Sequence, residues 1–239
     1  MTNDIRSSKV ILIQPTMGLS GEFVRHIPLS LLYVAAGLRS QPVRVEIVDN
    51  RLCPDQWKNR LRSLLDGPVL FVGLTVMSGA PVKNALEASR LVKDQRPEVP
   101  VVWGGSLSTV APETVLRDPS VDFAITGSGV RAVEQLAKEL FKPSHARDFS
   151  GVPGLGYKIS GKTVFNERFQ GFEPVPYRDI PYHLIPDYRA YGQIGSREMV
   201  FPVYTAYGCP YGCRFCISPA MYRGYPCKWV PLPARDVVD

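Results

Sequence analysis

Short apolar runs alternate with longer amphipathic segments through the first 142 residues. Each run is rich in β-branched residues, which is typical of strands buried on both faces. The segments between the runs carry apolar residues at helical spacing. The predicted strands are residues 9–14, 43–48, 69–74, 99–103 and 121–125. The predicted helices are residues 28–38, 55–65 (with Asp55 as its cap), 81–92 and 130–141.

This alternation predicts an α/β domain over residues 1–142. Strands joined by helices of this length need right-handed crossovers, so they form a doubly wound parallel sheet, here of five strands. Ligands of such sheets bind beyond the carboxyl ends of the strands. Glycine and small polar residues gather at the expected ends, which are residues 14–18, 75–79, 104–106 and 126–129.

The pattern changes after residue 142, where prolines become frequent and the helical period disappears. Residues 154–159 and 163–165 predict a hairpin around Ser160-Gly161-Lys162. Residues 174–186 predict an extended connector in which His183 has no ligand contact. We therefore expect a linker at residues 143–198, and then a strand at residues 199–205 that opens a second unit.

Composition narrows the function classes. The net charge is +6, and no apolar run approaches the roughly 20 residues of a membrane span. The basic stretch at residues 58–62 is interleaved with leucines at helical spacing, which favours a solvated helix face over a nucleic-acid site. Five cysteines and a polar start without a signal peptide predict a cytoplasmic protein without disulfides.

Three cysteines with Cys-x3-Cys-x2-Cys spacing carry the strongest chemical signal, namely Cys209, Cys213 and Cys216. Three thiolates on one short loop can each bind one iron of a 4Fe-4S cluster, which leaves the fourth iron open. A zinc site is the alternative, but structural zinc takes four ligands, and Cys227 would be an irregular fourth. Cys53 is expected to be a packing residue.

This spacing, with Phe215 before the last cysteine, resembles the signature of the radical S-adenosylmethionine (SAM) enzymes. The resemblance implies that Cys209, Cys213 and Cys216 bind the cluster, that the open iron binds SAM, and that Phe215 lies near its adenine. It also implies that one electron from the cluster splits SAM and releases a 5′-deoxyadenosyl radical.

A second resemblance concerns Thr75-Val76-Met77 and the later Gly104-Gly105, which look like the Ser-x-Leu and Gly-Gly elements of flavodoxin-like cobalamin-binding domains. In that family these elements line the channel for the nucleotide tail. The expected cobalamin contacts are Thr75, Met77, Ser78, Gly104, Gly105, Ser106, Thr126, Gly127 and Gly129. A bulky side chain at either glycine of the pair would occupy the path of the tail.

The loop after the first predicted strand departs from many cobalamin domains. It reads Gln14-Pro15-Thr16-Met17-Gly18 and lacks the histidine that would be the lower cobalt ligand. His26, the nearest histidine, is expected to face solvent or to cap a helix. This absence also resembles the cobalamin-dependent radical SAM class, in which a cobalamin domain precedes the radical domain.

A competing motif is Gly127-Ser128-Gly129-Val130-Arg131-Ala132, which fits the dinucleotide-binding Gly-x-Gly-x-x-Ala pattern with Asp148 further along. That fingerprint belongs to the first strand-to-helix unit of a sheet, and this one ends the alternating pattern. The amides at this helix start could instead hold a phosphate or amide of a nucleotide tail. The cobalamin family often has an acidic residue where Ser128 stands.

The resemblance implies the front portion of a cobalamin-dependent radical SAM enzyme acting on a small molecule. Residues 199–239 would begin an incomplete (β/α) barrel, so we expect that this chain alone does not complete turnover. Methyl transfer or ring formation at an unactivated carbon is implied, with flavodoxin or ferredoxin as electron donor. The alternatives are a non-catalytic cobalamin or nucleotide module with a vestigial or partner-completed loop, and a zinc-stabilised domain.

Overall fold

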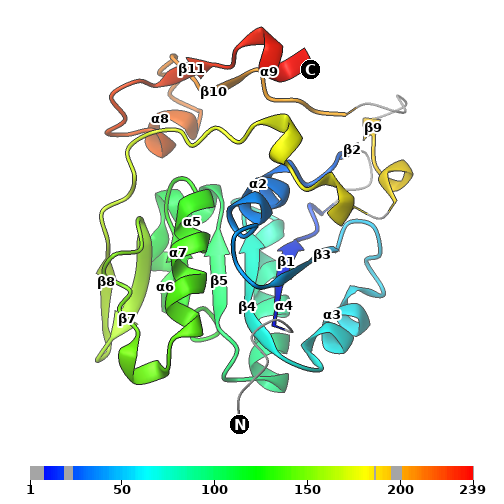
Figure 1. Ribbon diagram of the computed structural model, residues 1–239, viewed down its shortest axis with the longest axis vertical. Coiled ribbons are helices and arrows are strands. Elements are labelled where there is room, and N and C mark those ends of the chain that lie inside the picture. The colour runs from blue at the N-terminus through cyan, green and yellow to red at the C-terminus, as the bar shows by residue number, and fades with distance from the viewer. Residues whose placement is uncertain (1–7, 19–23, 186, 195–200, 239) are drawn as a thin grey trace.

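A seven-stranded sheet forms the centre of the computed structural model, which describes residues 8–18, 24–185, 187–194 and 201–238 (Figure 1). The strand order is β3-β1-β4-β5-β6-β7-β8. The bounds of these strands are β1 Lys9–Gln14, β3 Arg44–Asp49, β4 Val69–Thr75, β5 Val101–Gly104, β6 Phe123–Ile125, β7 Leu155–Ile159 and β8 Lys162–Phe165. The first five strands are parallel and have the flavodoxin-like order, which confirms the predicted doubly wound sheet.

The predicted hairpin is present, but it belongs to the sheet rather than to a separate linker. β7 pairs antiparallel with β6, and Phe123 lies opposite Tyr157 in the register. Leu155 and Tyr157 turn their side chains into the core, so the hairpin extends the edge of the sheet beyond the parallel strands.

Helices cover both faces of the sheet. α2 (Leu29–Gly37) and α7 (Val130–Phe141) pack together on one face, and α3 (Trp57–Leu65) and α4 (Pro81–Gln95) pack on the other (Figure 1). Successive residues of β1 enter opposite cores, because strand side chains alternate between faces: Val10 packs under α7, and Ile11 packs under α3. At Gly37 a Cβ atom would overlap the carbonyl of Val130, so glycine permits the close approach of α2 to α7.

Local details differ from the sequence pattern. α3 begins at Trp57, and no side chain caps it, so the expected cap at Asp55 is wrong. The connection from β5 to β6 contains two short helices that were not predicted, α5 (Ser106–Val110) and α6 (Pro112–Arg117). Their lengths are too short to show a helical period.

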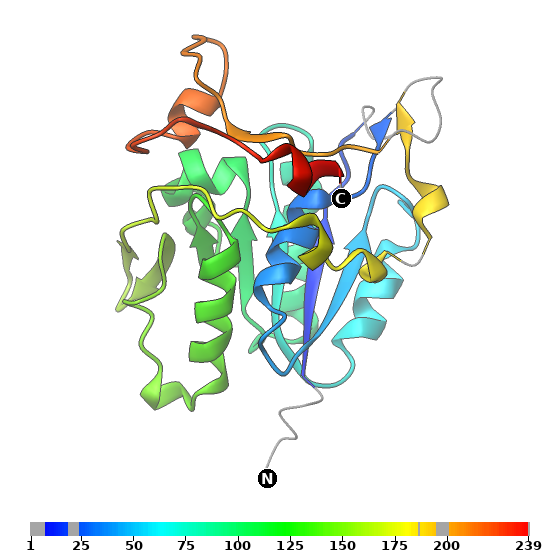
Figure 2. The same cartoon turned by 45° about the horizontal axis from the view of Figure 1, so that its top comes forward.

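The connector after the hairpin, residues 166–185 and 187–194, is a strap across α2 rather than a plain extended chain (Figure 2). Its turns pack onto α2 through a small apolar core, in which Val175 and Ile180 meet Leu32. The strap contains three 3₁₀ turns and ends in a strand paired with β2 (Val24–Arg25): η3 Tyr177–Asp179, η4 Tyr182–Leu184, η5 Tyr188–Ala190 and β9 Gln193–Ile194. A further 3₁₀ turn, η2 Ser144–Ala146, follows α7.

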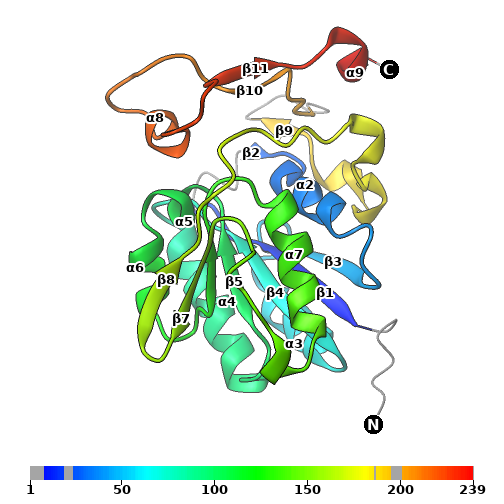
Figure 3. The same ribbon diagram turned by 60° about the vertical axis from the view of Figure 1, so that its left-hand side comes forward.

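The C-terminal segment lies above the carboxyl ends of the parallel strands (Figure 3). It comprises β10 (Ala206–Gly208), α8 (Ser218–Met221), β11 (Trp229–Pro231) and α9 (Ala234–Val238), and β10 pairs antiparallel with β11. The predicted strand at residues 199–205 is wrong for 201–205, which are irregular, and Met199 and Val200 lie outside the described residues. Within the described ranges, no helix is long and apolar enough to cross a membrane.

Candidate functional site

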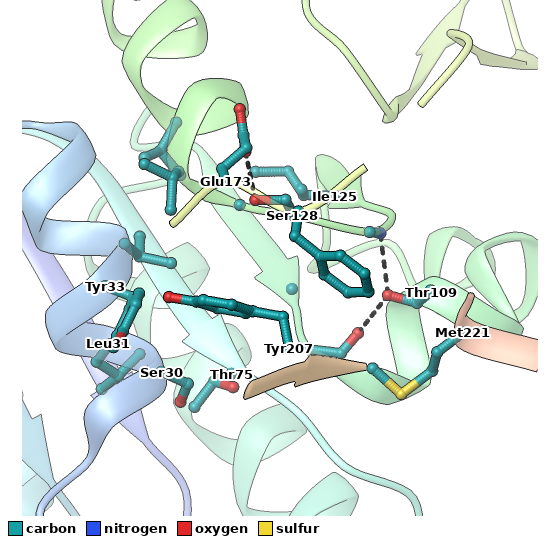
Figure 4. A pocket seen from close by; sticks show the side chains of 18 of the residues that line it. Ser30, Leu31, Tyr33, Thr75, Thr109, Ile125, Ser128, Glu173, Tyr207 and Met221 are labelled. Atoms are coloured by element: carbon teal, nitrogen blue, oxygen red, sulfur yellow. Dashed lines mark hydrogen bonds between the residues drawn. The ribbon is translucent and has the colours of Figure 1, made fainter. Parts of the chain in front are cut away.

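A cavity of about 330 Å³ lies between the sheet and the C-terminal segment. Its floor consists of buried strand residues from β1, β4 and β5, among them Leu12, Phe71 and Val102. Its walls come from α2 and from the start of α7 (Figure 4). The cavity therefore sits where doubly wound sheets hold their ligands, at the carboxyl ends of the strands.

Aromatic side chains form the roof of the cavity, and no sequence pattern indicated them. They are Phe172 from the strap and Tyr204, Tyr207, Tyr222 and Tyr225 from the C-terminal segment. The ring centroids of Phe172 and Tyr225 are 5.1 Å apart, and those of Phe172 and Tyr207 are 5.8 Å apart. Such contacts between rings hold the strap and the C-terminal segment together over the floor.

The strap is also tied to the C-terminal segment by polar contacts. The Tyr177 hydroxyl donates to the carbonyl of Tyr204 at 2.8 Å, and the main-chain N–H of Tyr204 returns to the same hydroxyl. The Arg168 guanidinium donates to the carbonyls of Met221 and Arg223. These contacts hold the C-terminal segment to the strap, and the strap in turn packs on α2.

One carboxylate stands at the rim of the cavity. Glu173 accepts hydrogen bonds from the Ser128 hydroxyl and the Arg131 main-chain N–H, and its Oε1 lies 3.0 Å from Nε of Arg131. Its side chain is only 11% exposed. A carboxylate of the strap thus lies beside Ser128, and a phosphate at the start of α7 would meet that carboxylate. The expected phosphate site at this helix start is therefore disfavoured.

Five of the predicted cofactor contacts line the cavity: Thr75, Gly104, Gly105, Gly127 and Gly129. Four others do not line it. Met77 and Ser78 point outward, Met77 with half of its surface exposed. Ser106 begins α5, and Thr126 donates its hydroxyl to the carbonyl of Gly154 at 3.0 Å.

The two adjacent glycines have different reasons to be glycine. A Cβ atom at Gly104 would meet only the Leu74 carbonyl oxygen, at 3.9 Å, so the position opens onto the cavity. Gly105 has φ +90°, and a Cβ there would lie 2.9 Å from both N and O of Val76. Gly104 thus leaves the cavity open at this point. Gly105, in contrast, is required because the main chain of Val76, just after β4, leaves no room for a Cβ atom.

The loop after β1 is held without a histidine. Asn84 Oδ1 accepts the main-chain N–H of Thr16 at 3.0 Å and the side-chain amide of Asn50 at 2.8 Å. His26 lies beside the buried Arg51, whose guanidinium donates to its carbonyl at 2.9 Å, and does not line the cavity. His183 is exposed in the strap.

The three predicted cluster ligands lie on the loop after β10. The main-chain N–H of Cys209 donates to the carbonyl of Lys228 at 2.8 Å, while Cys213 and Cys216 are exposed. The Ser218 side chain, and then its main-chain N–H, lower the pKa of the Cys216 thiol. The thiols suit a cluster chemically, yet among the described residues no three Cys, His, Asp or Glu side chains are gathered as a metal site.

Two neighbours of the loop bear on the alternatives. Cys227, the candidate fourth zinc ligand, directs its thiol to the carbonyl of Trp229 at 3.0 Å. Phe215 is 94% exposed and contacts none of the cavity. The ligand set and the adenine contact therefore stay predictions.

Residues 23–137 match the B12 binding domain family. An uncharacterized methyltransferase, PH0819, of Pyrococcus horikoshii is 31% identical over 199 residues, and the match covers 80% of this chain and 40% of that protein. The anaerobic magnesium-protoporphyrin IX monomethyl ester cyclase of Rubrivivax gelatinosus is 26% identical over 195 residues, and the match covers 81% of this chain and 34% of that protein.

A solved structure has the same fold over 98% of this chain. It is the radical SAM methyltransferase TsrM of Kitasatospora setae with cobalamin and a [4Fe-4S] cluster bound, with a TM-score of 0.67 and 20% identity, and 44% of its chain is covered. The present chain thus spans less than half the length of each of these relatives. Residues 23–137 are thus similar to B12 binding domains, and the chain has the fold of the front part of a cobalamin-binding radical SAM methyltransferase.

Proposed function

We propose that this chain is the front portion of a cobalamin-binding radical SAM enzyme. The observation that carries the proposal is the cavity beside Gly104, which joins a B12-binding domain to the segment bearing three cysteines. Its floor belongs to the sheet domain, and its roof includes Tyr207 and Gly208, directly before Cys209. A corrinoid held there would lie between its own binding domain and the cysteine loop.

The cavity fits part of a cobalamin rather than the whole cofactor. A volume of about 330 Å³ is near the lower end of the range for small-molecule pockets. It suits a flat, apolar base, because the floor side chains are hydrocarbon and Gly104 leaves the entrance open. We assign the nucleotide tail to the cavity, with Thr75, Gly127 and Gly129 along its walls. None of the described residues that line the cavity is a histidine that could be a lower cobalt ligand.

The cysteine loop is proposed to hold a 4Fe-4S cluster through Cys209, Cys213 and Cys216. Cys213 and Cys216 are exposed and Cys209 is partly exposed, so the thiols are accessible to iron, and the lowered pKa of Cys216 favours the thiolate that binds metal. When bound, the cluster supplies an electron for the cleavage of SAM, and a methylated corrinoid supplies a methyl group. The aromatic roof would exclude water from the space between the two cofactors.

The proposed reaction class is taken from the names of the two curated relatives. One relative is named as a methyltransferase and the other as a cyclase. We propose methyl transfer or ring formation on a small molecule, with flavodoxin or ferredoxin as electron donor and the cytoplasm as location. The remainder of the substrate site would come from protein beyond these residues or from a partner.

The test is anaerobic reconstitution with iron and sulfide, followed by metal analysis and by spectral titration with hydroxocobalamin. We expect about four irons per chain, loss of that iron in Cys213→Ala, and cobalamin binding in both proteins. Cys227→Ala is the matched control, because its thiol already contacts Trp229 and should not bind the cluster.

Other outcomes identify the alternatives. Cobalamin binding without iron would indicate a non-catalytic binding module. One zinc per chain that is lost in Cys227→Ala would indicate a zinc-stabilised domain. A protein that binds neither metal nor cobalamin would refute the proposal as a whole.

A further inference from the structure

Two phenol hydroxyls at the cavity are buried without a hydrogen-bond partner. They belong to Tyr33 on α2 and Tyr207 on β10, and both side chains line the cavity. Tyr33 is only 7% exposed, and within the described part of the chain neither hydroxyl has a partner. Buried polar groups in native proteins are rarely left unsatisfied, so these two need an explanation.

The two hydroxyls lie near each other but do not form a hydrogen bond of full geometry. Their ring centroids are 6.3 Å apart with an interplanar angle of 76°, and the Tyr207 hydroxyl points toward α2 (Figure 4). The hydroxyls are near enough to influence one another, yet no hydrogen bond of acceptable geometry joins them. Burial is the main cause that raises the pKa of Tyr33, and a weak interaction with the Tyr207 hydroxyl adds to it, so the Tyr33 hydroxyl stays protonated and can donate at neutral pH.

The distribution of polar groups around the cavity indicates what these donors face. The floor is apolar, and the rim near α7 holds the Glu173 carboxylate. The Glu173 carboxylate already takes up the Arg131 guanidinium, so among the described residues the α2 side offers the hydroxyl donors without a partner that an anionic part of a ligand could use. In a corrinoid, the phosphodiester lies between the lower base and the corrin ring, so a base on the floor places it nearer the roof.

We propose that the Tyr33 and Tyr207 hydroxyls donate hydrogen bonds to the phosphodiester of a corrinoid nucleotide tail bound in this cavity. This inference rests on the proposed function, because it names the recognition of a ligand whose binding is itself proposed. It makes the two tyrosines specificity residues, which distinguish corrinoids with a complete tail from those without one.

The test compares corrinoid affinity with the stability of the corrinoid-free protein. The variants are Tyr33→Phe and Tyr207→Phe, and Tyr188→Phe is the control, because Tyr188 is 53% exposed and lies outside the cavity. Each protein is titrated with cobalamin, with a corrinoid whose lower base is a phenol, and with cobinamide, which lacks the nucleotide tail. Thermal unfolding is measured without ligand.

We expect the Kd for cobalamin to rise about 10- to 100-fold in each cavity variant, the range of a lost hydrogen bond to a charged group. The phenolic corrinoid keeps its phosphodiester and should show the same rise, whereas cobinamide affinity should not change. The Tm should stay equal or increase, because an unpartnered buried hydroxyl is being removed.

Several results would overturn the inference. A lower Tm with unchanged Kd would mean that the hydroxyls bond to each other in solution. An effect that vanishes with the phenolic corrinoid would assign the acceptor to the base nitrogen, and an effect that persists with cobinamide would place it outside the tail. Wild-type protein that binds no corrinoid would reject the proposed function and this inference together.

Discussion

Replacing each of the adjacent glycines 104 and 105 should give opposite effects on ligand binding and on stability. Gly104 has open space where a Cβ would stand, so Gly104→Leu should fold normally and extend its side chain into the cavity. A buried aromatic group covers roughly 150–250 Å², which at about 25 cal/mol per Å² contributes roughly 4–6 kcal/mol. Exclusion of the base should therefore weaken cobalamin binding by roughly 10³- to 10⁴-fold.

Gly105→Ala should damage the fold instead. Its φ of +90° with ψ of −168° is a region nearly reserved for glycine, at a cost of roughly 1–3 kcal/mol for other residues. That cost corresponds to a fall in Tm of roughly 2–12 °C. The close approach of the new Cβ to N and O of Val76 should add to it.

The assays are spectral titration with hydroxocobalamin and thermal unfolding. Gly67→Ala is the matched control, because Gly67 also has a positive φ, +103°, but has no neighbour within 4 Å of a new Cβ. It should lose less stability than Gly105→Ala and bind cobalamin normally. The reasoning is refuted if Gly104→Leu binds cobalamin as tightly as wild type, or if Gly105→Ala is no less stable than Gly67→Ala.

Two further predictions concern charges. Arg51→Met should lower the free energy of unfolding by about 3–5 kcal/mol in urea, because it leaves the buried Asp49 carboxylate without the guanidinium that lies 2.6 Å away, where both side chains are 2% exposed. Arg60→Met removes an exposed ion pair with Glu46 and should cost under about 1 kcal/mol. Equal losses in the two variants would contradict this reasoning. Burial opposes the ionisation of Asp118, but hydrogen bonds from Ser120 outweigh burial and lower the pKa of the Asp118 carboxyl below 3.8. The ionised carboxylate therefore stabilises the fold above pH 3.8, and this stabilisation disappears as the pH falls through the pKa of the folded state. Ser120→Ala should therefore lose more stability near about pH 6 than near about pH 2, and a loss independent of pH would argue against this linkage.

The sheet could be predicted because local composition determines it. The run Val10-Ile11-Leu12-Ile13 has β-branched or apolar side chains for both faces, and no other element accommodates such a run as well. The short helices α5 and α6 escaped prediction because each has less than two turns in which to show a period. The prediction of a strand at 201–205 was wrong because the apolar side chains there face solvent and the roof of the cavity instead of a sheet core.

Half of the cavity was beyond prediction. Residues at strand ends, such as Thr75 and Gly104, could be found because the fold determines where those ends meet. The roof residues Phe172 and Tyr225 come together only through the path of the strap, which no local pattern encodes. Sequence reasoning also could not separate Gly104 from Gly105, because the distinction depends on a neighbouring backbone. The motif signal at residues 127–129 gave the wall but not Glu173, which lies more than forty residues later.

The roof and floor of the cavity come from distant parts of the chain, and this has a consequence for fragments. The B12 binding domain match ends at residue 137, whereas the roof begins at Phe172. A boundary drawn by homology therefore leaves out the roof of the cavity, and a fragment ending there would have an open groove in its place. A corrinoid bound as proposed should exchange faster from such a fragment than from the whole chain, and the strap would then set its residence time.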